Sequence, residues 1–213
     1  MSQASYSIIG RGGLFQPIRE ILTDHIFRGY YDDRATDDPT WLGAVAQYKD
    51  SDESGIFVAI AALRNMSLRR RLIQDLKQRN LLSLNAVSKD ASVATSVKMG
   101  VGNIICPNTC LHSKVTLGSG CIVFSNTAIE HDSVLGDNVN IAPGVTIAGG
   151  VRVDDDCYLG AGSVLIDGVV VGSGSVVGAG SVVLKSVPAG VIVYGNPAKI
   201  IRSNDLYLEP TIR

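Results

Sequence analysis

One histidine of this sequence lies between two acidic residues, in Ile129-Glu130-His131-Asp132. A carboxylate beside an imidazole suits it to act as a general base, which takes a proton from an incoming nucleophile. A lone histidine is also common on a solvated surface, so the pattern leaves both interpretations open. The other two histidines, His25 and His112, are interpreted as structural or surface residues.

A glycine-rich turn near the N-terminus has the composition of a phosphate-binding site. Gly10-Arg11-Gly12-Gly13 follows an apolar segment and precedes a predicted helix, so backbone N–H groups and the helix N-terminus can face an anion. Phe15 stands where a dinucleotide fingerprint has its third glycine. Asp32 and Asp33 follow about 20 residues later, where an acidic residue often contacts a ribose hydroxyl. The alternative is an ordinary tight turn with a solvated pair of charges.

Other chemistry-bearing residue types show no comparable pattern. Cys106, Cys110, Cys121 and Cys157 form no CxxC pair, and with three histidines they make a poor zinc site. The run Asp154–Asp156 is more typical of a solvated turn than of a metal site, because no further ligands cluster near it. We therefore expect no metal.

A repeat of six residues runs through the C-terminal part of the chain. Stepping by six from Val87 to Val183 meets Ile, Leu, Val or Met at all 17 positions. Seventeen of the 23 glycines and 22 of the 24 valines also lie at or after residue 87. The anchors are Val87, Val93, Met99, Ile105, Leu111, Leu117, Val123, Ile129, Leu135, Ile141, Ile147, Val153, Leu159, Leu165, Val171, Val177 and Val183.

A period of six fits neither an amphipathic helix nor a plain alternating strand. It is typical of the hexapeptide repeat of a parallel β-helix, in which each short strand is followed by a tight corner. In the triangular form three hexapeptides make one coil, so residues 18 apart stack about 4.8 Å from one another. Gly149 then lies one coil above His131, and its backbone N–H is accessible to an oxyanion that forms beside the imidazole. This pairing predicts acyl transfer.

The first 80 residues follow another pattern. Apolar segments at 6–10, 27–31 and 55–60 predict strands, and segments at about 15–23 and 68–78 predict helices. This order predicts a small, Rossmann-like parallel sheet. We therefore divide the chain into an α/β domain (1–84), a β-helix of hexapeptide repeats (85–202) and a C-terminal tail (203–213).

Composition excludes several function classes. The chain has 213 residues, with 19 basic and 20 acidic side chains and a formal net charge of −1. This balance argues against a globally basic nucleic-acid binder. No apolar run approaches the roughly 20 residues that span a bilayer. The N-terminus has no pattern of a secretory signal, so we expect a cytoplasmic protein without membrane insertion.

Five segments carry a resemblance to a known family: Gly10–Gly13, Tyr31–Asp33, Ile129–Gly136, Ile141–Gly144 and Tyr194–Lys199. On these, nearly the whole chain resembles bacterial nucleotide-sugar acyltransferases of the hexapeptide class, such as bacillosamine and perosamine N-acetyltransferases and sialic acid O-acetyltransferases. The resemblance implies a left-handed β-helix, acetyl-CoA as co-substrate and a homotrimer whose active sites lie between subunits.

The resemblance also implies a role for particular residues. His131 would be the general base, Asp132 would raise its basicity, and Gly149 would supply the oxyanion N–H. Asn140 stands where many relatives have a second histidine, and Leu14 where some have a histidine after the glycine pair. The nucleotide sugar would contact Gly12, Gly13, Leu14, Asp32, Asp33 and Ala61, and acetyl-CoA would contact Asn140, Ala161 and Ala179.

Three functions follow as hypotheses. The first is transfer of acetyl from acetyl-CoA to the amino group of a UDP- or dTDP-linked 4-amino-4,6-dideoxy sugar, in surface glycan synthesis. The amine would attack the acyl donor directly, with His131 as general base and without a covalent acyl-enzyme. The second is O-acetylation of sialic acid or another sugar hydroxyl. The third is a non-catalytic β-helix that binds a nucleotide. The front domain favours the first, since free sialic acid does not require a nucleotide site.

Overall fold

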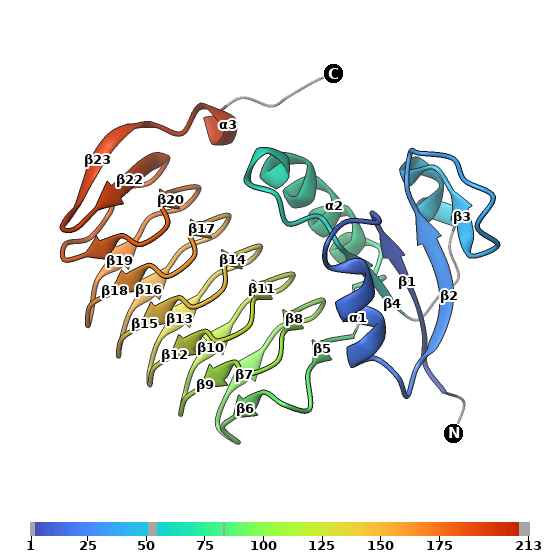
Figure 1. Cartoon of the computed structure of the whole chain (residues 1–213), viewed down its shortest axis with the longest axis horizontal. Helices are drawn as coiled ribbons and strands as arrows, with labels where there is room; N and C mark the ends of the chain where they lie inside the picture. The colour runs from blue at the N-terminus through green and yellow to red at the C-terminus, as the bar shows by residue number, and fades with distance from the viewer. Residues whose placement is uncertain (1–2, 51–54, 83, 209–213) are drawn as a thin grey trace.

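The computed structural model describes residues 3–50, 55–82 and 84–208, in which an α/β domain packs beside a long β-helix (Figure 1). Residues 1–2, 51–54 and 83 of the predicted front domain, and 209–213 of the predicted tail, lie outside this description. The elements of the α/β domain are β1 (Ser5–Ile9), α1 (Phe15–Ile21), β2 (Ile26–Tyr31), β3 (Trp41–Gly43), a 3-10 helix (Val45–Asp50), β4 (Gly55–Val58), a second 3-10 helix (Leu63–Asn65) and α2 (Met66–Gln78).

The sheet of this domain is parallel throughout, in the order β3-β2-β1-β4. Alternation along β1 places Ile8 in the cluster with α1 on one face, and Ile9 in the cluster with α2 on the other. The predicted parallel α/β sheet is therefore confirmed. The three-residue strand β3 was not predicted, because its sequence, Trp-Leu-Gly, is too short to show a period.

The 17 strands β5 to β21 are two residues long, and each ends on one of the 17 predicted anchors. They form three parallel sheets in which residues 18 apart pair, as Ile122 pairs with Asn140. The first sheet holds β5 (Ala86–Val87), β8 (Ile104–Ile105), β11 (Ile122–Val123), β14 (Asn140–Ile141), β17 (Tyr158–Leu159) and β20 (Val176–Val177). The second holds β6 (Ser92–Val93), β9 (Cys110–Leu111), β12 (Ala128–Ile129), β15 (Thr146–Ile147), β18 (Val164–Leu165) and β21 (Val182–Val183). The third holds β7 (Lys98–Met99), β10 (Thr116–Leu117), β13 (Val134–Leu135), β16 (Arg152–Val153) and β19 (Val170–Val171).

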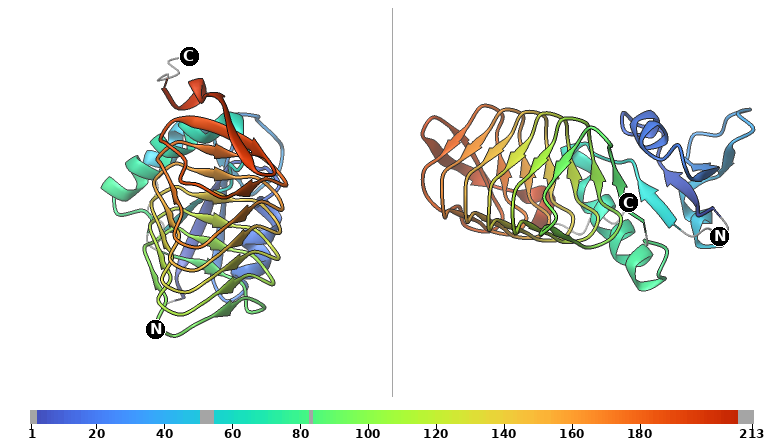
Figure 2. Two further views of the ribbon diagram at one scale, coloured as in Figure 1. Left: turned by 90° about the vertical axis from the view of Figure 1, so that its left-hand side faces the viewer. Right: turned by 90° about the horizontal axis from the view of Figure 1, so that it is seen from below.

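The interior of the β-helix is a single apolar core. Anchors such as Ile129 and Ile147 are fully buried, and so are the corner residues Cys121 and Cys157. Burial raises the pKa of both thiols to about 12, so these cysteines stay protonated and serve as packing residues. The predicted hexapeptide β-helix is confirmed, and its stacked coils are seen in Figure 2.

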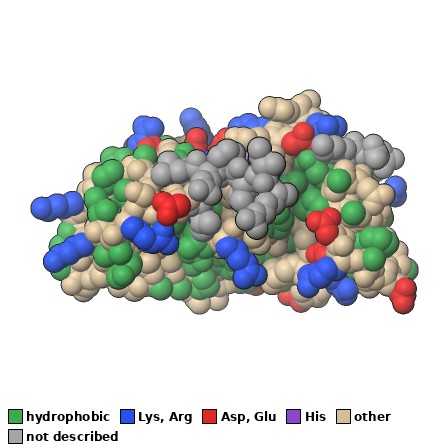
Figure 3. Space-filling model, turned by 90° about the horizontal axis from the view of Figure 1, so that it is seen from above, with side chains coloured by type: hydrophobic (Ala, Val, Ile, Leu, Met, Phe, Trp, Pro, Cys, Tyr) green, Lys and Arg blue, Asp and Glu red, His purple; other side chains and the backbone are tan. Residues whose placement is uncertain are grey.

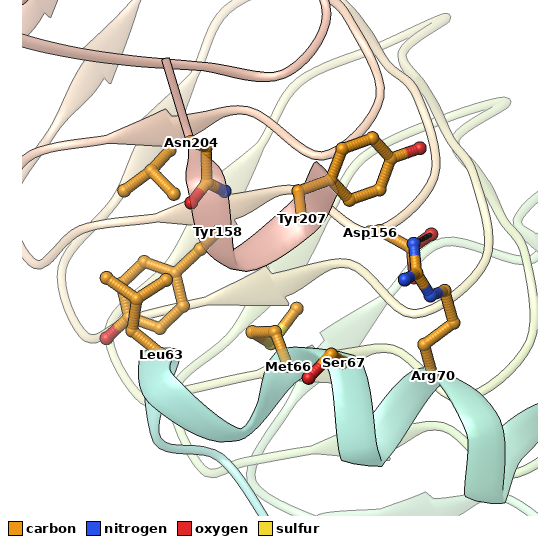
Figure 4. A pocket seen from close by; sticks show the side chains of 9 residues that line it. Leu63, Met66, Ser67, Arg70, Asp156, Tyr158, Asn204 and Tyr207 are labelled. Atoms are coloured by element: carbon orange, nitrogen blue, oxygen red, sulfur yellow. Dashed lines mark ion pairs between the residues drawn. The ribbon is translucent and has the colours of Figure 1, made fainter. Parts of the chain in front are cut away.

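The β-helix closes at its C-terminal end with an antiparallel hairpin. Strand β22 (Val191–Gly195) extends the first sheet and pairs with β23 (Ala198–Ser203), and α3 (Asp205–Leu208) then returns toward α2. The Tyr207 ring lies over Gly174, with the Arg70 guanidinium 5.0 Å from the ring centroid (Figure 4). The described part of the predicted tail therefore bridges the two domains.

Charged side chains of both signs are interspersed with apolar ones over the face shown in Figure 3. Within the ranges described above, every helix is too short or too polar to cross a bilayer.

The first sheet of the β-helix is the one that contacts the α/β domain. Ile104 and Ile122 project outward from it and are fully buried in the same cluster as Phe15 and Ile18 of α1. Beside them Arg69 of α2 is 1% exposed and donates to the carbonyl oxygen of Gly120 and to Oδ1 of Asn138. Burial lowers the pKa of Arg69 to about 10. The domains are thus joined by an apolar contact and a buried polar one.

We expect Arg69→Met to lower the free energy of unfolding by about 2 kcal/mol, because the two buried acceptors lose their donor. Thermal unfolding followed by calorimetry measures the change. Arg71→Met is the matched control, since Arg71 lies on the same helix and is exposed, and we expect it to change stability by less than about 0.5 kcal/mol. Equal melting temperatures for the two variants would contradict the role given to Arg69.

Candidate functional site

His131 lies in the corner between β12 and β13, with 56% of its side chain exposed. Its Nδ1 lies 2.9 Å from Oδ2 of Asp132. Side chains of adjacent residues in a strand point to opposite faces. These two meet because Asp132, with φ +60°, adopts the left-handed conformation and turns the chain at the corner. The structure thus brings together two residues to which the resemblance assigns roles.

The hydrogen bond to Asp132 defines which imidazole nitrogen can act as a base. The bond from His131 lowers the pKa of Asp132, as does Lys114, whose Nζ lies 3.7 Å from Oδ1. An ionised carboxylate only accepts hydrogen bonds, so in the neutral imidazole Nδ1 carries the proton and Nε2 carries the lone pair. This arrangement leaves Nε2 free to take a proton.

Gly149 lies directly against this free nitrogen. A Cβ atom added to Gly149 would be 2.8 Å from both Nε2 and Cε1 of His131. The stacking expected from the 18-residue spacing is thus observed. In the part of the chain that the structure describes, the backbone N–H of Gly149 has no hydrogen-bond partner, whereas its carbonyl accepts from Gly168. The imidazole therefore lies beside a residue whose N–H has no partner in this part of the chain, and acyl transfer requires a base and a donor of this kind.

A cleft of about 540 Å³ in the α/β domain collects the residues expected to hold a nucleotide sugar. It lies at the carboxyl ends of β1, β2 and β4, where ligands of parallel sheets usually bind. The lining residues that were not singled out from the sequence include Arg64 and Asn65, which follow β4, and Phe124 of the β-helix. Arg64 and Asn65 could have been identified as candidates because they follow a parallel strand, where ligands usually bind. All six expected residues line the cleft, namely Gly12, Gly13, Leu14, Asp32, Asp33 and Ala61.

The two aspartates hold the loops around this cleft. Asp32 accepts hydrogen bonds from the backbone N–H groups of Arg11 and Arg34, both at 3.0 Å, and Asp33 accepts one from Val45 at 2.9 Å. Burial opposes ionisation of Asp32, but the hydrogen bonds from Arg34 and Arg11 outweigh it and lower its pKa. Both carboxylates thus hold the loops that form the rim of the cleft.

The three residues expected to contact acetyl-CoA do not lie together. Ala161 and Ala179 are exposed on consecutive coils, where the Gly180 N–H donates to the Ala161 carbonyl at 2.8 Å. Asn140 is fully buried in β14, and its Nδ2 donates to the carbonyl oxygen of Ala61 at 2.8 Å. Its Oδ1 has no partner within the described ranges. Asn140 therefore ties the β-helix to the wall of the cleft.

The site residues follow two edges of the triangular β-helix. We call the corner between the second and third sheets the histidine edge; it includes residues 112–114, 130–132 and 148–150. We call the corner between the first and second sheets the alanine edge; it includes residues 124–126, 142–144, 160–162 and 178–180. The cleft meets the alanine edge at Phe124. Since the α/β domain covers the first sheet, the core of the β-helix separates the cleft from His131 of the same chain.

Over the described residues, no three or more His, Cys, Asp or Glu side chains are grouped so that they could hold a metal ion.

Two segments of the β-helix match a known protein family. Residues 114–149 and 150–185 match the family described as bacterial transferase hexapeptide (six repeats). The comparison with curated proteins gave no match.

Several solved structures are similar over almost the whole chain. A variant of GDP-perosamine N-acetyltransferase from Caulobacter crescentus, in complex with CoA and GDP-perosamine, is 28% identical with a TM-score of 0.84, and the match covers 94% of this chain and 98% of that one. The acetyltransferase domain of PglB from Neisseria gonorrhoeae, in complex with acetyl-CoA, is 25% identical with a TM-score of 0.85, covering 94% and 100%. WeeI from Acinetobacter baumannii is 28% identical with a TM-score of 0.80, covering 93% and 100%. The resemblance inferred from the sequence is confirmed.

Proposed function

We propose that this hexapeptide-repeat protein transfers the acetyl group of acetyl-CoA to the amino group of a nucleotide-linked amino sugar. The observation that carries the proposal is the contact of His131 with Gly149, whose N–H has no hydrogen-bond partner among the described residues. The nucleotide-sized cleft beside the β-helix supports a nucleotide-linked acceptor. The N-acetyltransferases of similar structure support an amine as the acceptor.

The reaction follows from these groups. The amine nitrogen forms a bond to the thioester carbonyl carbon while Nε2 of His131 takes a proton from it. The carbonyl oxygen gains negative charge and accepts a hydrogen bond from the N–H of Gly149. The carbon–sulfur bond then breaks, and the proton held by His131 passes to the thiolate of CoA. Asp132 keeps the imidazole in the required tautomer and stabilises its charged form.

A neighbouring copy of the chain completes the site. The acceptor cleft adjoins the alanine edge, and His131 lies on the histidine edge. Parallel copies that set one edge against the other bring the cleft, Ala161 and Ala179 of one chain beside His131 of the next. Such a head-to-tail contact closes into a ring, and we propose a homotrimer with three shared sites.

The finer assignment is a 4-amino-4,6-dideoxy sugar linked to UDP or dTDP. Because a similar enzyme binds GDP-perosamine, the test includes a third nucleotide. Purified protein and acetyl-CoA are offered UDP-, dTDP- and GDP-linked 4-amino sugars and free sialic acid, and release of the CoA thiol is followed. We expect release with an amino sugar, and mass spectrometry of the product to show one added acetyl group on nitrogen.

The same assay separates the alternatives. Release with sialic acid alone would replace this proposal with O-acetylation, and the absence of release with every acceptor would leave a nucleotide-binding scaffold.

A further inference from the structure

A second imidazole lies beside His131 on the histidine edge. The ring centroids of His112 and His131 are 6.3 Å apart, and the rings meet edge to face at 68°. The 18-residue register stacks Ser113 under His131 and His112 under Glu130. His112 is therefore one position away from Ser113, the residue that the 18-residue spacing stacks on His131. For this reason the spacing alone did not identify the contact of His112 with His131.

His112 keeps one ring nitrogen free. Its Nδ1 lies 3.1 Å from Oγ of Ser113, which holds the ring in place, and the side chain is exposed. Within the described residues Nε2 of His112 has no hydrogen-bond partner. If the Ser113 hydroxyl donates to Nδ1, Nε2 carries the proton, and if it accepts, Nε2 is the acceptor. A sugar hydroxyl can both donate and accept, so it matches Nε2 in either tautomer.

The order of residues along the β-helix places His112 on the acceptor side. Gly149 lies one coil toward the C-terminus from His131, where the thioester oxygen is bound in the proposed reaction. His112 lies on the opposite side of His131, one coil toward the N-terminus. The alanine edge has the same order, because Phe124 of the cleft precedes Ala161 and Ala179. Parallel copies therefore bring the acceptor past His112 to reach His131.

We propose, on the basis of the proposed function, that His112 binds the acceptor sugar through a hydrogen bond between its Nε2 and a sugar hydroxyl near the reacting amine. His131 removes the proton, and His112 orients the ring that carries the amine. His112 thus determines which amino sugars are accepted, and it has no part in binding acetyl-CoA.

Steady-state kinetics with the amino sugar that supports thiol release tests this role. We expect His112→Ala to raise the KM for the amino sugar about tenfold, the effect of one lost hydrogen bond, and to leave the KM for acetyl-CoA unchanged. His112→Gln should recover part of the loss, because its amide nitrogen lies near the position of Nε2. An acceptor that lacks the contacted hydroxyl should be used equally well by the wild type and by His112→Ala.

The control is Lys98→Ala, which removes an exposed side chain from the third sheet, away from both edges. An unchanged KM for the amino sugar in His112→Ala, or an equal rise in the KM for acetyl-CoA, would overturn the role of His112 while leaving the proposed function intact. A wild-type protein that is inactive with all amino sugars would instead overturn the proposed function, and this inference with it.

Discussion

Replacing His131 with alanine is expected to lower acetyl transfer between about 10² and 10⁴-fold, which is the usual contribution of a general base. The amine must lose a proton as it attacks the thioester, and Nε2 of His131 is the nitrogen that the Asp132 contact leaves free for this. The thiol-release rate with a saturating amino sugar measures the loss. The melting temperature should remain close to that of the wild type, because more than half of the side chain is exposed.

His131→Asn makes this test specific to proton removal. The asparagine amide can still donate to Asp132 in place of Nδ1, but it has no equivalent of Nε2. We therefore expect His131→Asn to be as inactive as His131→Ala. Recovery of activity in the asparagine variant would show that His131 acts by positioning alone. Wild-type rates in both variants would show that His131 takes no part in acetyl transfer.

Replacing Gly149 with alanine is expected to lower the rate about 10² to 10³-fold, although it adds only one methyl group. The new Cβ would lie 2.8 Å from Nε2 and Cε1 of His131, closer than such atoms approach, so the imidazole must move or the methyl group must fill the space of the reacting carbonyl. Loss of access to the Gly149 N–H alone has an effect of this size. The φ of Gly149 lies outside the left-handed range, so the backbone accepts alanine without strain.

The double variant His131→Ala/Gly149→Ala tests whether the two residues act as one unit. The methyl group of alanine at 149 is expected to displace the His131 imidazole and to block the backbone N–H of residue 149. If it acts in this way, the double variant should be about as inactive as His131→Ala alone. Losses that multiply would show that Gly149 contributes independently of the imidazole. A Gly149→Ala protein with wild-type activity would contradict its role in holding the oxyanion.

The six-residue repeat predicted the β-helix and the contacts between its coils. In a solenoid each coil contacts only its neighbours, so a fixed period of 18 residues converts directly into contacts between side chains. That is why Gly149 could be placed against His131, and why the buried positions of Cys121 and Cys157 could be predicted. The strands at 5–9 and 26–31 and the glycine turn between them were also apparent, because alternation and turn chemistry are local signals.

Other features depended on the tertiary structure. The buried Arg69 and the bond from Asn140 to Ala61 arise where the α/β domain docks on the β-helix, and no periodic pattern marks such a contact. The contact of His131 with Asp132 depends on a left-handed corner that strand alternation does not predict. His112 reaches His131 across an offset in register that only side-chain geometry reveals.

The sequence by itself determined the repeat, the stacking of Gly149 on His131 and the presence of a front domain, because each depends on spacing along the chain. Only the tertiary structure decided where the cleft lies relative to His131. It gathered the six cleft residues at one end of a parallel sheet, and it set them across the β-helix core from His131. The physical reason is that docking depends on the shapes of two folded surfaces, and these surfaces exist only after both domains have formed.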